Sequence, residues 1–392
     1  MVDVAELQIN NETFSQLPAR LKYNEVIAGY YENLADEEKI TGYPDDKLER
    51  KADRLRSCSK IWDVDWHRLQ GAKGVVNANL CRDKFCVNCL SALALSREHK
   101  FSPVFNSFAK HSSVYHCIFT VKNCSGLMLR PTIKNMFKSF SYFVRYLDNR
   151  AKIKNYNFSC LGYRAAVRSL EVTYNEEKNT YHPHLHCLMV FSSDLKLNKH
   201  IENSFSYSYN HDDVRYFSSE EVLFQKIWYL LNNGQKVNRE NVEKLDLGYS
   251  VVFNEAKPED YKEVFKYAFK ADLDKDKVFG YEQFKVYSKA LKDLRFIQGY
   301  GECIGFEFDD DDISDEELDI AYHEIKAQLD EIEEPVRIHE DYDVMLDNME
   351  NNRYRYYTSG SIKKFLLEQA TENRMTDESR DIVEKFKEQF KR

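Results

Sequence analysis

Hydrophobic and polar positions are patterned most regularly in the middle of this 392-residue chain, between residues 113 and 300. Apolar runs of four to nine residues predict β-strands there, and apolar positions spaced by three and four predict helices. The predicted strands are Val114–Lys122, Tyr163–Tyr174, Tyr181–Phe191 and Tyr249–Asn254, with a last strand pair near Arg295–Phe308. The polar stretch 175–180 predicts the turn that joins the second and third strands.

Helical periodicity separates these strands. The predicted helices run from Pro131 to about Asp148, over Glu220–Leu231, from Pro258 to about Phe269 and over Tyr281–Leu294. Proline suits the first turn of a helix, because its missing N–H group has no partner there in any case. The mixture of strands and helices predicts an α+β protein.

Composition shifts divide the chain into four predicted parts. Residues 1–54 form a polar leader with a short helix near Tyr23–Leu34, and residues 55–100 form a cysteine-rich segment. Residues 101–308 form the main domain, and an acidic run at Asp309–Asp319 opens an acidic region, 309–392. That region is predicted to be helical, with amphipathic stretches at Ile362–Gln369 and Ile382–Phe390.

Charge and targeting signals narrow the functional classes. The sequence has no apolar run long enough to span a bilayer and no signal-peptide pattern, so we expect a cytoplasmic protein without a membrane partner. The net charge of −9 is unevenly distributed: basic residues prevail between 95 and 300, and acidic residues prevail after 301. A basic middle is compatible with a DNA-binding body, although ordinary solvated surface charge explains it equally well.

The stretch Tyr181–His186 reads Tyr-His-Pro-His-Leu-His. Side chains alternate across a strand, so its three histidines share one face. If the hairpin pairs Tyr174 with the first residue of this stretch, Glu171 lies opposite His184 on the same face. Two imidazoles, from His184 and His186, and one carboxylate suit Mn²⁺ or Mg²⁺. A slip of one residue would send Glu171 to the other face.

Two other interpretations of these histidines stay open. They are an exposed cluster without a role, or a Zn²⁺ hydrolase site. The sequence contains no His-Glu-x-x-His helix of the kind that metalloproteases use.

A second candidate constellation lies on the helix predicted after Pro258. Glu263 and Tyr267 are four residues apart and share a helix face, and Lys266 and Lys270 occupy an adjoining strip. Tyrosine is a nucleophile toward phosphate when a metal polarises the phosphate, and nearby lysines favour the phenolate and bind DNA phosphates. Glu263 is one turn away and could act as a general base. Tyr261 is the next candidate nucleophile, and simple packing is the alternative role for all of these side chains.

Nine cysteines in a reducing compartment indicate metal ligands or buried thiols instead of disulfides. Four of them have spacing that suits a tetrahedral, structural Zn²⁺ site. These four are Cys58, Cys81, Cys86 and Cys89. His67 or His99 could replace Cys58 as the fourth ligand, and separate buried thiols are the alternative.

Three segments in this order resemble the motifs of the HUH endonucleases, specifically the plasmid rolling-circle replication initiators with a Tyr-and-Glu active site. The segments are Phe119–Asn123 (Phe-Thr-Val-Lys-Asn), His182–His186 (His-Pro-His-Leu-His) and Glu263–Lys270 (Glu-Val-Phe-Lys-Tyr-Ala-Phe-Lys). The resemblance covers roughly residues 55–308. It implies an HUH-type antiparallel sheet with flanking helices and the histidine pair on a central strand. A small cysteine-rich segment precedes this sheet, and the acidic helical region follows it.

The resemblance also implies a mechanism. The protein would nick a hairpin origin in DNA, with His184 and His186 as metal ligands, Tyr267 as nucleophile and a tyrosine left attached to the 5′ phosphate. Lys122, Lys266 and Lys270 are expected to contact DNA. The sequence contains no Gly-rich phosphate loop, so host helicase and polymerase are the expected partners. A homo-oligomer, an HUH transposase or relaxase, and a non-catalytic zinc-containing nucleic-acid-binding protein stay open as alternatives.

Overall fold

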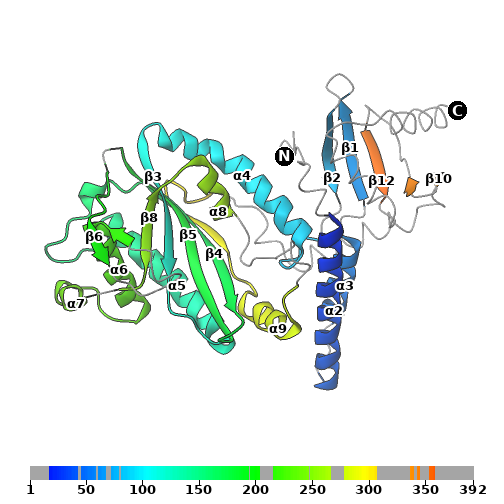
Figure 1. Ribbon diagram of the computed structural model, residues 1–392, viewed down its shortest axis with the longest axis horizontal. Helices are drawn as coiled ribbons and strands as arrows, with labels where there is room; N and C mark the ends of the chain where they lie inside the picture. Colours follow the sequence, from blue (N-terminus) through cyan, green and yellow to red (C-terminus); the bar gives the residue numbers. More distant parts are fainter. Residues whose placement is uncertain are drawn as a thin grey trace. The chain divides into compact units, whose positions relative to one another are not determined.

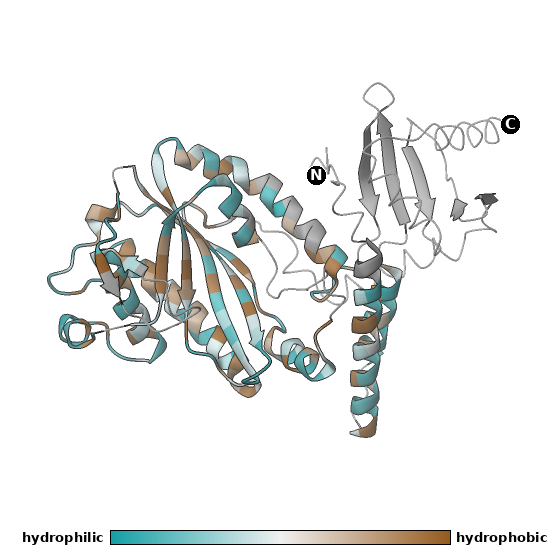
Figure 2. Ribbon diagram, in the orientation of Figure 1, coloured by the Kyte–Doolittle hydropathy of each residue, from teal (hydrophilic) through white to brown (hydrophobic). Residues whose placement is uncertain are grey.

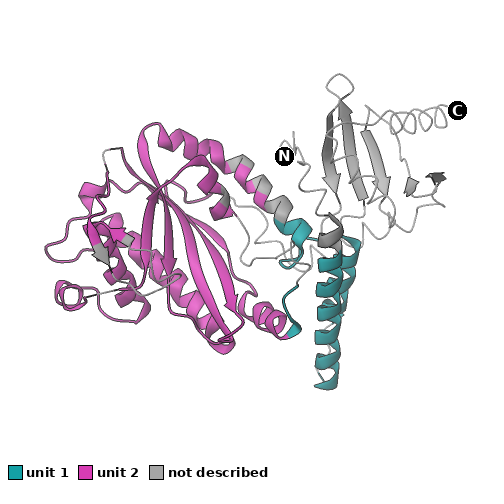
Figure 3. Ribbon diagram, in the orientation of Figure 1, with its two compact units in different colours: residues 1–92, 271–281, 312–392 teal, residues 93–270, 282–311 magenta. Residues whose placement is uncertain are grey.

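The computed structural model describes residues 17–42, 46–58, 61–67, 72–78, 81–193, 195–203, 215–246, 248–265, 278–306, 336–339, 342–344 and 353–357. The chain divides into two compact units (Figure 3). The first unit contains residues 1–92, 271–281 and 312–392, and the second contains residues 93–270 and 282–311. Segments from both ends of the chain therefore belong to the same unit.

The second unit is built on a five-stranded antiparallel sheet (Figure 1). From edge to edge its strands are β8 (Val251–Glu255), β3 (Ser112–Thr120), β5 (Thr180–Ser192), β4 (Ala165–Asn175) and β9 (Ile297–Gly301). The expected antiparallel sheet is thus confirmed. The strand that carries the histidines, β5, is its central strand.

One face of this sheet is covered by α5 (Gly126–Leu147) and α6 (Ser219–Asn232). The odd-numbered side chains of β3 point to this face. Phe119 is fully buried there, with its ring centroid 5.1 Å from that of Phe143 and 5.2 Å from that of Trp228. Truncating a buried aromatic residue of this kind costs about 3–5 kcal/mol. These aromatic contacts therefore form the main core under the sheet.

The helix α8 (Tyr261–Phe265) packs against β4 and β5 and contacts α4 (Val87–Ala109) (Figure 1). The ring of Phe265 stacks on that of Phe101, with centroids 5.8 Å apart, and Tyr261 contacts Phe105. Tyr261, Phe265 and Phe105 are all buried. Apolar packing against α4 therefore fixes α8 next to the two strands of the hairpin.

The remaining elements of the second unit are short. They are α7 (Arg239–Lys244), most of α9 (Tyr281–Ala290), the strand pair β6 (Ile201–Asn203) and β7 (Arg215–Phe217), and 3₁₀ turns at Ser159–Leu161 and Pro258–Asp260. Hydrophobic and hydrophilic residues are interspersed along β4 and β5 (Figure 2). This hydropathy pattern matches strands that carry polar groups within a largely buried sheet.

The first unit contains two paired helices, α2 (Leu17–Ile40) and α3 (Asp46–Ser57). Arg56 joins them, with Nε 2.8 Å from Glu25 Oε1 and Nη2 2.8 Å from Glu32 Oε2. This unit also contains a sheet in the order β12 (Arg353–Tyr357), β1 (Ile61–His67), β2 (Ala72–Ala78), and a hairpin of β10 (Val336–His339) and β11 (Tyr342–Val344). No helix among the described residues has the length and hydropathy needed to cross a membrane.

The structure confirms the predicted hairpin register and corrects several element boundaries. Tyr174 pairs with Tyr181, and Glu171 pairs with His184. The helix expected to begin at Pro131 begins at Gly126 instead, so the proline lies inside it. The leader helix expected near Tyr23–Leu34 is the longer helix α2, Leu17–Ile40. The helices α3 and α4 were not predicted.

The acidic region also differs from its expectation. Its described residues form the strands β10, β11 and β12, where a helical region was expected. The stretches Ile362–Gln369 and Ile382–Phe390 lie outside the described residues. The boundaries predicted at residues 54, 100 and 308 stay predictions.

Candidate metal centre and its neighbouring helix

The backbone register of the β4–β5 hairpin gathers the polar side chains of the candidate centre. Glu171 lies directly opposite His184, and Ser169 lies opposite His186. Because side chains alternate along a strand, Glu171, His184 and His186 project from the same face of the sheet. The polar turn and the strand register thus bring Glu171 into contact with His184 and His186, which lie 13 and 15 positions later in the sequence.

The three side chains meet at one carboxylate oxygen. Glu171 Oε2 lies 3.1 Å from His184 Nε2 and 2.8 Å from His186 Nε2. Their side chains are 10 to 14% exposed, so the cluster is largely shielded yet reachable. Ligand atoms at about 2.1 Å from an octahedral cation are about 3.0 Å from their neighbours. The donor set therefore fits a small divalent cation, with the remaining coordination positions free for other ligands.

The ionisation of Glu171 favours cation binding at this cluster. Burial by itself raises the pKa of the Glu171 carboxyl, but hydrogen bonds from His184 and His186 outweigh that effect. The net result is a pKa well below the usual carboxyl range, so Glu171 is ionised at neutral pH. On the other side of the His184 ring, Nδ1 lies 3.2 Å from the carbonyl oxygen of His182, which can only accept a hydrogen bond. Nδ1 therefore donates, and Nε2 is directed at Glu171.

His116 is a further histidine beside this centre, in contact with His186, and the sequence interpretation did not include it. It lies on β3, is 8% exposed, and its Nε2 is 3.1 Å from Nδ1 of His186. Burial lowers its pKa, as does the neighbouring His186, while Asp260 and Glu263 raise it. The available signal was a lone histidine within the apolar strand predicted at Val114–Lys122.

The predicted nucleophile helix is described in part. Tyr267, Lys266 and Lys270 lie outside the described residues. Glu263 lies in α8 and is half-buried, and its charge acts on His116. The helix that precedes Tyr267 therefore lies near the Glu171–His184–His186 cluster.

Two further candidate residues have contrasting surroundings. Tyr261 is 2% exposed, and burial raises its pKa, so this alternative nucleophile is shielded from substrate. Lys122 is exposed in the loop after β3. That loop is tied to the start of β5 by Asn123, whose Nδ2 donates to Thr180 Oγ1 at 3.1 Å.

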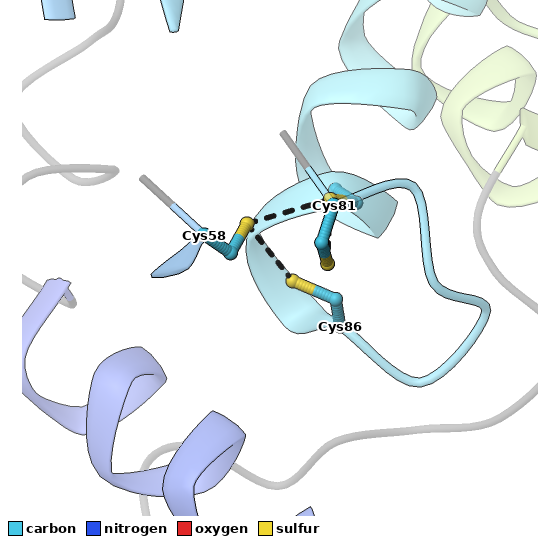
Figure 4. Close-up of side chains that lie close together, drawn as sticks. Cys58, Cys81 and Cys86 are labelled. Carbon is cyan, nitrogen blue, oxygen red and sulfur yellow. Dashed lines mark hydrogen bonds between the residues drawn. The ribbon is translucent and has the colours of Figure 1, made fainter. Parts of the chain in front are cut away.

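The four predicted zinc ligands form a second candidate metal centre, in the first unit, and Figure 4 shows three of them, Cys58, Cys81 and Cys86. Cys58 Sγ lies 3.4 Å from Cys86 Sγ and 3.6 Å from Cys89 Sγ, and Cys81 Sγ lies 3.6 Å from Cys89 Sγ. Zn–S bonds of about 2.3 Å place the sulfurs of a tetrahedral site about 3.8 Å apart. All four thiols are buried, so the set fits a structural Zn²⁺ ion, with Cys58 in the position for which His67 and His99 were alternatives.

Interactions among the thiols shift their pKa values in opposite directions. Hydrogen bonds from Cys81, Cys86 and Cys89 lower the pKa of Cys58 well below the usual thiol value. Burial raises the pKa of Cys81 and of Cys89 well above it. A divalent cation would relieve the cost of burying several thiolates together.

The leader helix α2 contributes directly to the cysteine centre. Asn24 Nδ2 donates to Cys86 Sγ at 3.1 Å, and its Oδ1 accepts from the backbone N–H of Val87 at 3.2 Å. The backbone N–H of Arg82 donates to Cys89 Sγ at 3.1 Å. Asn24 carried no signal in the sequence, because it lies 62 residues from Cys86.

Fold and side-chain geometry together define an α+β protein with a carboxylate–imidazole cluster on β4 and β5 and a separate four-cysteine cluster, each of which could hold a metal ion. Residues 72–203 match the family model described as a replication protein. This segment includes Glu171, His184 and His186 and three of the four cysteines.

Curated relatives agree with this match. The chain is 32% identical over 163 residues to "Protein rep" of Streptococcus pneumoniae serotype 2, covering 41% of this chain and 46% of the relative. It is 30% identical over 169 residues to "Protein rep" of Bacillus amyloliquefaciens, covering 42% and 44%. A "Protein rep" of Staphylococcus aureus is 24% identical over 203 residues, covering 50% and 76%.

These matches show that the chain is similar to the Rep replication proteins, in agreement with the resemblance of its motifs. The match spans a little under half the length of the first two relatives. No solved structure matches the chain.

Proposed function

We propose that this protein initiates rolling-circle replication of a plasmid by nicking one strand of its origin with Tyr267. The observation that carries this proposal is the cluster of Glu171, His184 and His186 within a replication-protein domain, with α8 packed against the same two strands. A cation site close to the segment that carries a tyrosine suits metal-assisted phosphoryl transfer, because the cation can polarise a phosphate that the tyrosine attacks.

The chain's own residues have distinct tasks in this reaction. Glu171, His184 and His186 would hold Mn²⁺ or Mg²⁺, which supplies Lewis-acid polarisation of the scissile phosphate. The Tyr267 oxygen forms a bond to phosphorus, and the bond to the 3′ oxygen breaks. The 3′ oxygen leaves with the electron pair, takes up a proton and becomes the free 3′-OH, while the 5′ phosphate stays on the tyrosine.

Other side chains bind the strand and end the reaction. Lys122, Lys266 and Lys270 would contact DNA phosphates, which makes binding dependent on salt. Glu263 is four residues before Tyr267 and would act as a general base for the water or strand that resolves the second cleavage.

The cysteine centre has a structural task in this proposal. Cys58, Cys81, Cys86 and Cys89 would hold Zn²⁺ with all four positions filled by protein, which leaves no open position for substrate. Because the ligands come from the ends of α3 and α4, the ion would hold the first unit together.

The expected partners follow from the reaction. A hairpin origin presents the single-stranded nick site, and a host DNA polymerase extends the 3′-OH behind a host helicase. These steps take place in the cytoplasm, and self-association of the initiator stays open.

A nicking assay tests the proposal. Purified protein is incubated with Mn²⁺ and supercoiled DNA of the replicon that encodes it. We expect relaxed circles with the wild type, none with Tyr267→Phe, and wild-type nicking with Tyr261→Phe, the matched control six positions earlier in the sequence. Nicking by Tyr267→Phe would overturn the assignment of the nucleophile. Tight origin binding without nicking by the wild type would instead indicate a non-catalytic DNA-binding protein.

A further inference from the structure

His116 occupies a position where a histidine is costly unless it has a partner. It lies in the middle of β3, between Leu188 of β5 and Asn254 of β8 in the strand register, and is 8% exposed. Val114, two residues earlier and on the same face of β3, is a buried apolar residue. Burying an imidazole in such surroundings is unfavourable unless its nitrogens are hydrogen-bonded.

The partner of this imidazole is His186. His116 Nε2 lies 3.1 Å from His186 Nδ1, and the two rings are inclined by only 16°. Their centroids are 5.4 Å apart, which equals the nitrogen–nitrogen distance plus the two ring radii. The two nitrogens therefore lie on the line that joins the ring centres. This is the in-plane geometry of a linear hydrogen bond.

We infer that His116 is a positioning residue: it accepts a hydrogen bond from Nδ1 of His186 and thereby aims Nε2 of His186 at the metal. This inference rests on the proposed function, because it assumes a cation on Glu171, His184 and His186. A histidine that binds a cation through Nε2 must carry its ring proton on Nδ1. Nδ1 then needs an acceptor, and His116 Nε2 is the atom that lies within reach.

The two ligand histidines are thus oriented by different acceptors. Nδ1 of His184 faces the backbone carbonyl oxygen of His182 on the same strand. Any residue at position 182 would supply this backbone acceptor. Nδ1 of His186 faces a side chain on the neighbouring strand, which a single substitution can remove. Without the His116 side chain, the buried Nδ1–H group of His186 has no acceptor, or its proton moves to Nε2 of His186 and blocks the atom that would bind the metal.

The prediction is a selective loss of metal affinity. Removing a hydrogen-bond partner of this kind from a metal-ligating histidine typically weakens metal binding by about 10- to 100-fold. His116→Phe keeps a flat ring of similar size and removes the acceptor. His116→Gln places a side-chain carbonyl oxygen near the position of Nε2, so it retains an acceptor for His186.

The test measures Mn²⁺ binding to the full-length chain by calorimetry, together with the melting temperature of the metal-free protein. We expect His116→Phe to weaken Mn²⁺ binding by about 10- to 100-fold and His116→Gln to stay within a few-fold of the wild type. His111→Phe, an exposed histidine immediately before β3, is the control and should bind normally. Excess Mn²⁺ should restore nicking by His116→Phe.

Each alternative result has a definite meaning. Wild-type affinity in His116→Phe, with a wild type that binds Mn²⁺ and nicks DNA, would overturn the positioning role and leave the proposed function intact. Equal losses of affinity and of melting temperature in the Phe and Gln variants would reduce His116 to a packing residue. A wild-type chain that binds no Mn²⁺ would overturn the proposed function itself, and with it this inference.

Discussion

At the scale of single residues, the charge of Glu171 is stabilised by its two imidazole neighbours. Burial opposes ionisation of this carboxyl group, but hydrogen bonds from His184 and His186 more than compensate. A carboxylate that is already ionised contributes both a ligand atom and a negative charge to a cation. Glu171 should therefore account for a large part of the metal affinity.

The first prediction concerns this carboxylate. Glu171→Gln keeps the size of the side chain and removes its charge, so Mn²⁺ affinity should fall by about 100-fold, which corresponds to about 2.7 kcal/mol. Glu177→Gln, an exposed glutamate in the turn of the same hairpin, should leave the affinity unchanged. Calorimetric titration measures both, and unchanged affinity in Glu171→Gln would remove it from the ligand set.

The second prediction concerns Asn24, whose amide donates to Cys86 Sγ. Hydrogen bonds from N–H groups stabilise thiolates, so Asn24→Ala should release Zn²⁺ to a competing chelator about 10-fold faster than the wild type. Asn33→Ala replaces an exposed asparagine on the same helix and serves as the matched control. A coloured zinc indicator reports the release rate. Equal rates for the two variants would show that the Asn24 contact has no part in retaining the ion.

At the scale of elements, packing against α4 determines where α8 lies. Phe265 is 1% exposed and stacks on Phe101, and it precedes Tyr267 by two residues. The candidate metal ligands lie on β4 and β5, where the pairing of the two strands holds them together. Nucleophile placement and metal binding should therefore be separable by mutation.

The third prediction uses that separation. Phe265→Ala should cost about 3–5 kcal/mol of unfolding free energy and displace the helix, and Phe265→Leu should cost less. Nicking should fall strongly in the alanine variant while Mn²⁺ affinity stays at the wild-type value. Parallel loss of Mn²⁺ affinity and nicking would contradict the independent roles of helix and hairpin.

The sequence pattern predicted the β4–β5 hairpin because the two strands and their turn are consecutive in the sequence. The spacing of the histidines and the polar turn set the β4–β5 register, and Glu171 came to lie opposite His184 as expected. The contacts of His116 with His186 and of Asn24 with Cys86 span 70 and 62 residues, and no periodicity records them. The prediction that α5 begins at Pro131 was wrong, because the first turn is the preferred position of proline but α5 contains Pro131 in its interior.

At the scale of the whole molecule, the two candidate metal centres belong to different compact units. The four-cysteine centre is in the first unit, and the Glu171–His184–His186 centre is in the second. Strand β12 from the acidic region pairs with β1, so the stability of the first unit depends on segments far apart in the sequence. That pairing was not predicted, because a strand partner nearly 300 residues away leaves no local signal.

The fourth prediction follows from this division. A ligand that binds only the folded state stabilises the unit that contains its site. Calorimetric melting should resolve two transitions: removal of Zn²⁺ with a strong chelator should lower one, and added Mn²⁺ should raise the other. One transition that responds to both metals would contradict the assignment of the two sites to separately folding units.

The central claim, that Tyr267 becomes covalently linked to DNA, can be tested directly by mass spectrometry. The wild-type protein is incubated with Mn²⁺ and a single-stranded oligonucleotide that contains the origin nick site, and the DNA-linked peptide is then isolated and sequenced. The account predicts a phosphodiester-linked nucleotide on Tyr267, formed through its 5′ phosphate and absent when Mn²⁺ is withheld. A linkage to another residue, or a cleaved strand without any protein linkage, would contradict it.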